Sequence, residues 1–304
     1  MRRAPRLRRL RRMTQTGTLL LLVAIPMLCL QEITVITGTL YSIAVLGLEM
    51  TDPLMVLQHG LATRSLHASL LLSGFIPLAL AVILGPVFCS WVCPQGLVSE
   101  LAENSLKSLT RHRRPVRLRT AAGSRPLWVR AKWAVPIAGA LAVAFLSVPF
   151  FYYGSAPGVI SRELASLVYL GTLGGELALV AVILLLEALG SPRAWCRILC
   201  PIGTVLCACR TPLTLQVRHD QNHRCDAGAC GLSCAGACQL GIDPRIRKDL
   251  WLCNNCGDCV EACPDRALSW SFPLLTRTRS DPPASSPAPD RASYLAHRRG
   301  KGTE

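Results

Sequence analysis

Eight cysteines fall within 39 residues, from Cys225 to Cys263, and they limit what this part of the chain can become. From Cys253 onward the chain is Cys-Asn-Asn-Cys-Gly-Asp-Cys-Val-Glu-Ala-Cys-Pro, a C-x2-C-x2-C-x3-C-P run. In such a run three thiolates surround one [4Fe-4S] cluster, and the fourth ligates the other cluster of a two-cluster fold. A zinc ribbon would need two C-x2-C pairs separated by a longer loop, and a disulfide framework would need a secreted context. The spacing therefore favours iron–sulfur binding over both alternatives.

The first half of this cysteine-rich stretch is less regular. Its spacings are x4, x3 and x3, and Gln239 stands where the pattern has proline, although Gly241-Ile242-Asp243 resembles the usual ending. Two hypotheses stay open, a second cluster or a decayed site whose cysteines only pack. If the fourth cysteine of each run crosses over, the pattern predicts two ligand sets in a ferredoxin-like α+β domain over residues 215–275. These sets are Cys225, Cys230, Cys234 and Cys263 for one cluster, and Cys253, Cys256, Cys259 and Cys238 for the other.

The rest of the chain is apolar and basic. Of its 304 residues 51% are hydrophobic, and 33 lysines and arginines against 18 acidic residues give a net charge of +15. High apolarity with a basic excess favours a membrane protein with basic flanks. Nucleic-acid binding is the rival explanation of the charge, but the arginines form blocks between apolar runs, not one basic face with interleaved aromatics. We therefore expect no nucleic-acid partner.

Four apolar segments are each close to the length of about 20 residues that crosses a hydrocarbon core of about 30 Å. The predicted membrane spans are residues 15–34, 67–88, 133–151 and 169–189. They follow a basic N-terminus at residues 1–14 and belong to a four-helix membrane domain at residues 15–200. The predicted fold class is an α-helical integral membrane protein with four transmembrane helices and a C-terminal cytoplasmic domain. The tail at residues 276–304 is rich in proline and serine and is predicted to be disordered.

Lysine and arginine counts predict the orientation in the membrane. Seven arginines lie in residues 1–12 and nine basic residues lie between the second and third spans, whereas the outer loops hold only Arg64 and Arg162. The positive-inside rule predicts a multi-pass membrane protein with both termini in the cytoplasm. Thiols stay reduced there, which favours metal binding over disulfides. Arg11-Arg12 is similar to a twin-arginine export signal, but no small-x-small cleavage site follows, so we expect an uncleaved first helix.

Two short motifs of one kind follow the second and fourth spans. They are Cys89-Ser-Trp-Val-Cys93-Pro94 and Cys196-Arg-Ile-Leu-Cys200-Pro201. Cysteines at i and i+4 share a helix face, so we predict that the four thiols converge on one membrane face as an additional redox site. The alternative is that they are structural thiols at helix ends. The nearby Cys207 and Cys209 have weaker spacing and are interpreted as bystanders.

Other segments carry weaker signals. Residues 38–66 are too apolar for an ordinary loop, and the part around Asp52 is predicted to form a turn and a short helix at the outer interface. No histidine lies inside a predicted span, so we expect no haem. Glu176 lies in the fourth span, and both a functional role and a structural role stay open for it. Glu187 lies at its cytoplasmic end and is expected to snorkel. We find no hydrolytic catalytic set and predict no catalytic residue.

These parts together resemble the NapH/MauN family of ferredoxin-type membrane proteins. The resemblance covers about residues 10–270 and rests on the four spans, the two Cys-x3-Cys-Pro motifs, Thr-Asp-Pro-Leu at residues 51–54 and the C-terminal cysteines, with Phe88 to Pro94 the most specific part. It implies two [4Fe-4S] clusters and electron transfer from the quinol pool to a periplasmic pathway, either nitrate reduction or methylamine utilisation. The implied partner is a periplasmic ferredoxin-type or cytochrome subunit, and the implied location is the bacterial inner membrane. The Gly-Ile-Asp ending is also similar to polyferredoxins tied to terminal-oxidase assembly.

Two classes of function stay open. The favoured one is a membrane-bound carrier, the electron-transfer component of a quinol dehydrogenase, in which clusters relay single electrons. The other is an assembly or maturation factor, whose reduced clusters supply electrons to a metal centre that is built elsewhere. Reduction of the clusters by added quinol would discriminate between them.

Overall fold

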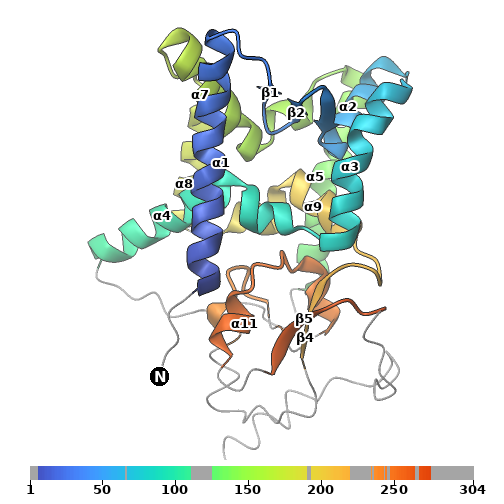
Figure 1. Ribbon diagram of the computed structural model, residues 1–304. Helices are drawn as coiled ribbons and strands as arrows, with labels where there is room; N and C mark the ends of the chain where they lie inside the picture. Colours follow the sequence, from blue (N-terminus) through green and yellow to red (C-terminus); the bar gives the residue numbers. More distant parts are fainter. Residues whose placement is uncertain are drawn as a thin grey trace, which may run out of the picture.

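The computed structural model describes residues 6–65, 67–110, 125–189, 193–219, 234, 236–242, 244, 247–263 and 267–274. The predicted ligands Cys225 and Cys230 and the predicted disordered tail lie outside these residues. Helices α1 (Arg6–Leu30) and α3 (Ala68–Leu84) run along the long axis of the molecule, with the C-terminal domain at one end (Figure 1). A small sheet lies toward the other end (Figure 1).

The remaining helices pack around α1 and α3. Helix α4 lies across the end of α1 that faces the C-terminal domain (Figure 1). Helix α7 contacts both α1 and α8, and α5 contacts α9. The bounds are α4 Pro94–Thr110, α5 Arg125–Leu146, α6 Phe150–Tyr153, α7 Ala156–Leu170, α8 Leu177–Leu189 and α9 Pro201–Ala208. One core cluster joins buried residues of α2 (Pro53–Thr63), α3, α5, α6 and α9 and the N-cap of α9: Leu54, Ala81, Val143, Phe151, Ile202, Leu206 and Cys200.

Among the described residues, α1 is the one helix that is long and apolar enough to cross a membrane by length and composition. Three shorter apolar helical segments accompany it: Ala68–Leu84, Ala131–Leu146 and Leu177–Glu187. Their outer faces carry large exposed apolar side chains, such as Leu72 at 72%, Phe145 at 81% and Leu185 at 57% exposure. Apolar surface of this kind marks contact with a membrane or a protein partner. The four predicted spans thus correspond to one long helix and three shorter ones.

The predicted fourth span begins too early. Tyr169 belongs to α7, which ends at Leu170, and Gly171 caps that helix in the left-handed conformation with φ 65°. Helix α8 starts only at Leu177. The apolar residues in between gave a continuous hydropathy signal, but Gly171, Gly174 and Gly175 interrupt the helix there, because glycine favours turns and helix ends over helix interiors.

The segment between α1 and α3 folds back on the bundle. Strands β1 (Ile36–Gly38), β2 (Ser42–Val45) and β3 (Leu48–Thr51) form an antiparallel sheet in that order. Helix α2 (Pro53–Thr63) follows, with the Asp52 carboxylate accepting from the Leu54 N–H at 2.7 Å and proline in its first turn. The predicted short helix is confirmed. The sheet was not predicted, because three- and four-residue strands are too short to show an alternating pattern.

The C-terminal domain combines one strand pair with short helices. Strand β4 (Gln216–His219) pairs antiparallel with β5 (Leu268–Ser271), so the chain that enters the domain is joined to the chain that leaves it. Between them lie a 3-10 helix, η3 (Arg247–Leu252), and α11 (Asp258–Ala262). The core of the domain consists of Val217, Cys234, Cys259, Cys263, Ala267 and Leu268. The described part of the domain is therefore α+β.

A substitution of Gly158 on α7 tests how the segment between α1 and α3 packs against the helices. A Cβ at Gly158 would lie 1.7 Å from Cζ of Tyr41, whose hydroxyl donates to the Tyr152 carbonyl at 2.6 Å. Gly158→Ala is expected to displace Tyr41 and to lower stability by about 1–3 kcal/mol, as overpacking does. Thermal unfolding of the detergent-purified protein measures this. The matched control is Gly175→Ala, because a Cβ there meets no atom within 4 Å. Equal unfolding temperatures for the two variants would contradict the packing described.

Candidate electron-transfer site

Each Cys-x3-Cys-Pro motif folds into a π-helical turn that leads directly into an α-helix. The first turn, η1 (Phe88–Val92), precedes α4, and the second, η2 (Trp195–Leu199), precedes α9. In each turn the second cysteine donates its N–H to the carbonyl five residues earlier, Cys93 to Phe88 at 2.8 Å and Cys200 to Trp195 at 2.9 Å. Short π-helical turns are frequent at functional sites. The chain builds the same turn twice.

The two turns bring their thiols together. Cys89, Cys93, Cys196 and Cys200 line one cavity between the helices and the C-terminal domain. Cys93 and Cys200 are buried, Cys89 and Cys196 are half-buried, and no cysteine in the described ranges forms a disulfide. A fifth thiol, Cys207 of α9, lines the same cavity. Segments more than 100 residues apart in the sequence therefore supply one set of sulfur atoms.

Burial keeps these thiols protonated when nothing positive is bound. It raises the pKa of Cys93 to about 12, and the Cys200 thiol adds to the shift. Burial raises the pKa of Cys89 and Cys196 as well, again with Cys200 as the next cause. Coordination to a metal would reverse this, because a coordinated thiol loses its proton.

The backbone around these sulfur atoms favours negative charge. The N–H groups of Gln95 and Gly96, at the start of α4, donate to the sulfur of Cys93 and lower its pKa against the larger effect of burial. Ile202 and Gly203, at the start of α9, do the same for Cys200. Helix N-termini stabilise anions through such free N–H groups. The two motifs thus present sulfur and backbone donors in the same arrangement.

Two buried basic side chains line the same cavity. Lys132 of α5 is 3% exposed, and its Nζ lies 3.6 Å from Sγ of Cys207 and 5.7 Å from the ring centre of Trp251. Arg193 has a side chain that is 7% exposed, and its charge lowers the pKa of Cys196. A buried cation is costly unless a negative group lies nearby. Arg193 has the Glu100 carboxylate at 3.8 Å, and for Lys132 four thiolates around a [4Fe-4S] core would be the negative group, so the residues that line this cavity fit such a cluster.

A single metal ion fits the cavity less well. In the part of the chain that the structure describes, no three His, Cys, Asp or Glu side chains lie close enough together to hold one ion. A zinc ion would draw its sulfur ligands to about 2.3 Å from one point. A cubane spreads its irons over a larger core, so cysteines that are further apart can each reach one iron.

The C-terminal domain closes the cavity with its cysteine loop. Leu240, Leu252 and Asn254 of this domain belong to the lining. The Ser90 hydroxyl, inside the first π turn, donates to the Asn254 carbonyl at 2.7 Å, and the Trp91 indole donates to the Asn255 carbonyl at 3.2 Å. The first turn therefore holds the loop that begins with Cys253.

Arg210 and Asn255 fix this loop from the other side. Arg210, just after α9, donates to the carbonyls of Leu250 at 2.6 Å and Cys253 at 2.5 Å. The buried Asn255 amide donates to the carbonyls of Leu84 at 2.9 Å and Leu215 at 2.7 Å. Asn255 and Gly257 have positive φ values of 54° and 80°. This left-handed geometry directs the Asn255 N–H to the sulfur of Cys253, and backbone N–H groups arranged in this way favour anions.

Six of the eight predicted ligands of the domain lie in described residues, and they form one neighbourhood. Burial raises the pKa of Cys259, and four nearby thiols raise it further. These are Cys256, Cys253, Cys238 and Cys234, in decreasing order of effect. Cys234 also packs in the domain core with Cys259 and Cys263. Backbone N–H groups donate to two of the sulfur atoms, Ile242 to Cys238 at 3.3 Å and Asn255 to Cys253 at 3.4 Å.

Sequence reasoning missed several residues of the cavity. Cys207 was interpreted as a bystander and not as a ligand; the structure places it in the cavity lining, where its sulfur accepts from Nζ of Lys132 at 3.6 Å. Its Cys-Ala-Cys context lacks a ligand spacing, so no local signal marked it. Lys132 and Arg193 were missed because basic residues near membrane spans are normally explained by topology.

The two acidic residues of the predicted fourth span have structural partners. Glu176 precedes α8, and its carboxylate accepts from Nε of Arg162 at 2.9 Å. The prediction that Glu187 snorkels is wrong, because its side chain is buried at 8% exposure beside Ser99. Burial is possible there because α4 covers this end of α8.

Comparison with known proteins points to the same segments. The family described as "4Fe-4S binding domain" matches residues 66–116 and 173–206, which contain both Cys-x3-Cys-Pro motifs. The methylamine utilization ferredoxin-type protein MauN of Methylorubrum extorquens is 31% identical over 231 residues, covering 74% of this chain and 73% of MauN. The ferredoxin-type protein NapH of Haemophilus influenzae is 26% identical over 244 residues, covering 73% and 75%.

A longer relative is also similar. YccM of Escherichia coli is 28% identical over 229 residues, which cover 69% of this chain but only 58% of YccM. The chain thus spans little more than half the length of that relative. No solved structure shows a significant match.

Loss of one cavity thiol tests whether the four act as one site. Cys196→Ser is expected to lower the iron content of anaerobically purified protein by about four atoms, because a [4Fe-4S] cluster needs its complete ligand set. Cys29→Ser is the control, since Cys29 of α1 is half-buried outside the cavity lining. Equal iron content in both variants would show that the motif thiols hold no cluster.

Proposed function

The chain belongs to the NapH/MauN family of ferredoxin-type proteins, and on this basis we propose that it carries electrons from membrane quinol through iron–sulfur clusters toward a periplasmic pathway. One observation carries the proposal. The thiols of both Cys-x3-Cys-Pro motifs line a single cavity, and the cysteine loop of the C-terminal domain closes it. The segments that carry the two groups of sulfur ligands are therefore in direct contact with each other.

The cysteines divide into three ligand sets. Cys89, Cys93, Cys196 and Cys200 hold a membrane-proximal centre, and Lys132 and Arg193 offset its negative charge. In the C-terminal domain, Cys238 completes the set of Cys253, Cys256 and Cys259, supported by the nearness of these four thiols. The other set is Cys225, Cys230, Cys234 and Cys263, and the packing of Cys234 with Cys263 is consistent with it. When bound, such clusters exchange single electrons.

The protein's own groups define the path between these sets. Cys207 and Asn254 both line the cavity, and Asn254 directly follows Cys253 in the sequence. Ser90 and Trp91 hold the loop in place, so the separation of the sites is fixed by hydrogen bonds and not by a flexible linker. Fixed, water-excluding geometry suits a relay, because side reactions of reduced clusters with solvent are limited.

The exposed apolar faces of α1, α3, α5 and α8 support a membrane location. The start of α1 meets the C-terminal domain directly, since the Leu7 N–H donates to Glu261 of α11 at 3.1 Å. This contact supports the proposal that the basic N-terminus and the cluster domain share one side of the membrane, the cytoplasmic side by the positive-inside rule. Quinol would then be oxidised within the helical part, next to the cavity.

Anaerobic membranes that contain the protein provide the test. Added quinol is expected to reduce the clusters, seen as the EPR signal of reduced [4Fe-4S] centres, and Cys93→Ser should abolish quinol-driven reduction while dithionite still reduces the C-terminal clusters. Cys29→Ser should behave as the unmodified protein, because Cys29 lies outside the cavity lining. Failure of every quinol to reduce the unmodified protein would overturn the proposal and favour an assembly factor that is reduced by another donor.

A further inference from the structure

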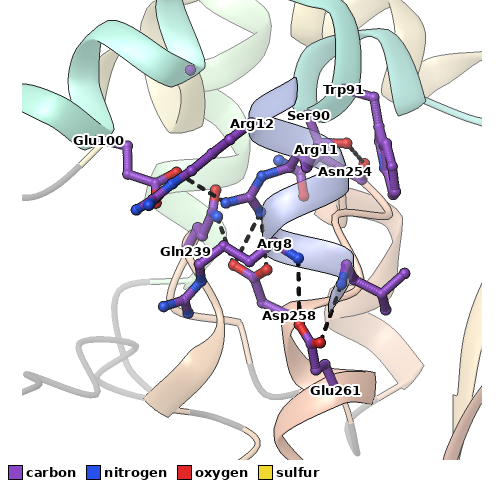
Figure 2. A network of polar contacts seen from close by, with 12 residues as sticks. Arg8, Arg11, Arg12, Ser90, Trp91, Glu100, Gln239, Asn254, Asp258 and Glu261 are labelled. Carbon is purple, nitrogen blue, oxygen red and sulfur yellow. Dashed lines mark hydrogen bonds and ion pairs between the residues drawn. The ribbon is translucent and has the colours of Figure 1, made fainter. Parts of the chain in front are cut away.

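Arg11 of the arginine pair lies in a buried network of charges, and Arg12, whose side chain is 42% exposed, forms the outer edge of that network. The Arg11 side chain is 1% exposed, and its Nη1 donates to both carboxylate oxygens of Asp258, each at 3.0 Å. Its Nη2 donates to Glu100 at 3.0 Å. Figure 2 shows the guanidinium of α1 between the carboxylates of α11 and α4. One side chain thus joins three segments that are far apart in the sequence.

Glu100 holds the second half of this network. It accepts from Arg12 at 2.5 Å and lies 3.8 Å from Arg193, the cation that lines the thiol cavity. Burial alone would raise the pKa of Glu100, but the Arg12 hydrogen bond and the charges of Arg11, Arg12 and Arg193 bring it below the ordinary value. The carboxylate is therefore ionised at neutral pH, and the network extends from α1 to the cavity wall.

On its other side the network reaches the predicted ligands of one cluster. Asp258 lies between Cys256 and Cys259 in the sequence. Its carboxylate also accepts from the side-chain amide of Gln239 at 2.6 Å, and Gln239 directly follows Cys238. Arg11 therefore anchors, through one carboxylate, segments that carry three cysteines of the set formed by Cys238, Cys253, Cys256 and Cys259.

The same face of α1 also anchors the membrane-proximal thiols. Gln15 lies one turn after Arg11, so the two side chains share a helix face. The buried Gln15 amide donates to the Ser90 carbonyl at 2.9 Å and to the Cys93 carbonyl at 3.4 Å. A single turn of one rigid helix therefore contacts the supports of both predicted cluster sites, and it sets their separation.

Resting on the function proposed above, we infer that α1 acts as a clamp between the two sites. Arg11 is its positioning residue, holding the Cys256–Cys259 loop against the membrane-proximal cavity. The arginine pair that is similar to an export signal thus has an architectural role. The basic N-terminus contains a natural contrast, since Arg9 of the same helix is exposed whereas Arg11 is buried.

Redox titration followed by EPR tests the role of Arg11. The sign of the change in midpoint potential distinguishes a charge effect on the cluster from a loss of stability. Arg11→Gln leaves the Asp258 carboxylate unneutralised beside the loop, so the midpoint potential of that cluster should shift to more negative values. Asp258→Asn leaves the Arg11 cation less neutralised, so the potential should shift the opposite way. Net charge near a cluster is one of the properties that set its potential. Arg11→Lys, which keeps the charge, should lie close to the unmodified protein.

The matched control is Arg9→Gln, which removes the same charge from an exposed position of α1 and should leave the potential unchanged. Hydrogen exchange of α11 gives a second readout that needs no quinol, and faster exchange is expected in Arg11→Gln but not in Arg9→Gln. If Arg11→Gln matches Arg9→Gln in both measurements, the inference is overturned. If both Arg11→Gln and Asp258→Asn shift the potential in one direction, Arg11 is only a stability contact. A failure of quinol reduction would leave both readouts intact.

Discussion

Four thiols from two distant copies of one turn must face the same cavity, and the rest of the structure depends on this constraint. Only tertiary packing can meet it. Each π turn places its second cysteine at the start of a helix, so backbone N–H groups point at the sulfur. Lys132 and Arg193 add positive charge where water is excluded. An apolar core would need none of these groups. Together they favour a negatively charged occupant.

The contact between the helical part and the C-terminal domain follows from the same constraint. The domain closes the cavity with the loop around Asn254, and that loop is held by Ser90 and Trp91 of the first turn. Arg11 and Gln15 of α1 brace the arrangement from the side. A buried ion pair contributes little net stability, but removal of one partner is strongly destabilising. A buried ion pair of this kind therefore fixes the position of the domain on the helices more than it stabilises the fold.

The sequence predicts the cysteine motifs better than it predicts how the segments that carry them pack together. Cysteine spacing is local, so the run from Cys253 and the two Cys-x3-Cys-Pro motifs could be recognised directly. Cys207 and Lys132 meet only through packing of α5 on α9, which no spacing encodes. The Arg11–Asp258 pair joins positions 247 residues apart. Hydropathy also merged the end of α7 with α8, because it averages over glycines that interrupt a helix.

The central claim is that the thiols of the two turns hold one cluster that adjoins a cluster of the C-terminal domain. EPR spectra of the fully reduced protein at two microwave frequencies test it most directly, since neighbouring paramagnetic centres split or broaden each other's signals by an amount that does not scale with frequency. The account predicts such an interaction between the membrane-proximal centre and a cluster of the domain. Spectra that are the plain sum of isolated clusters, or that lack a membrane-proximal centre, would contradict it.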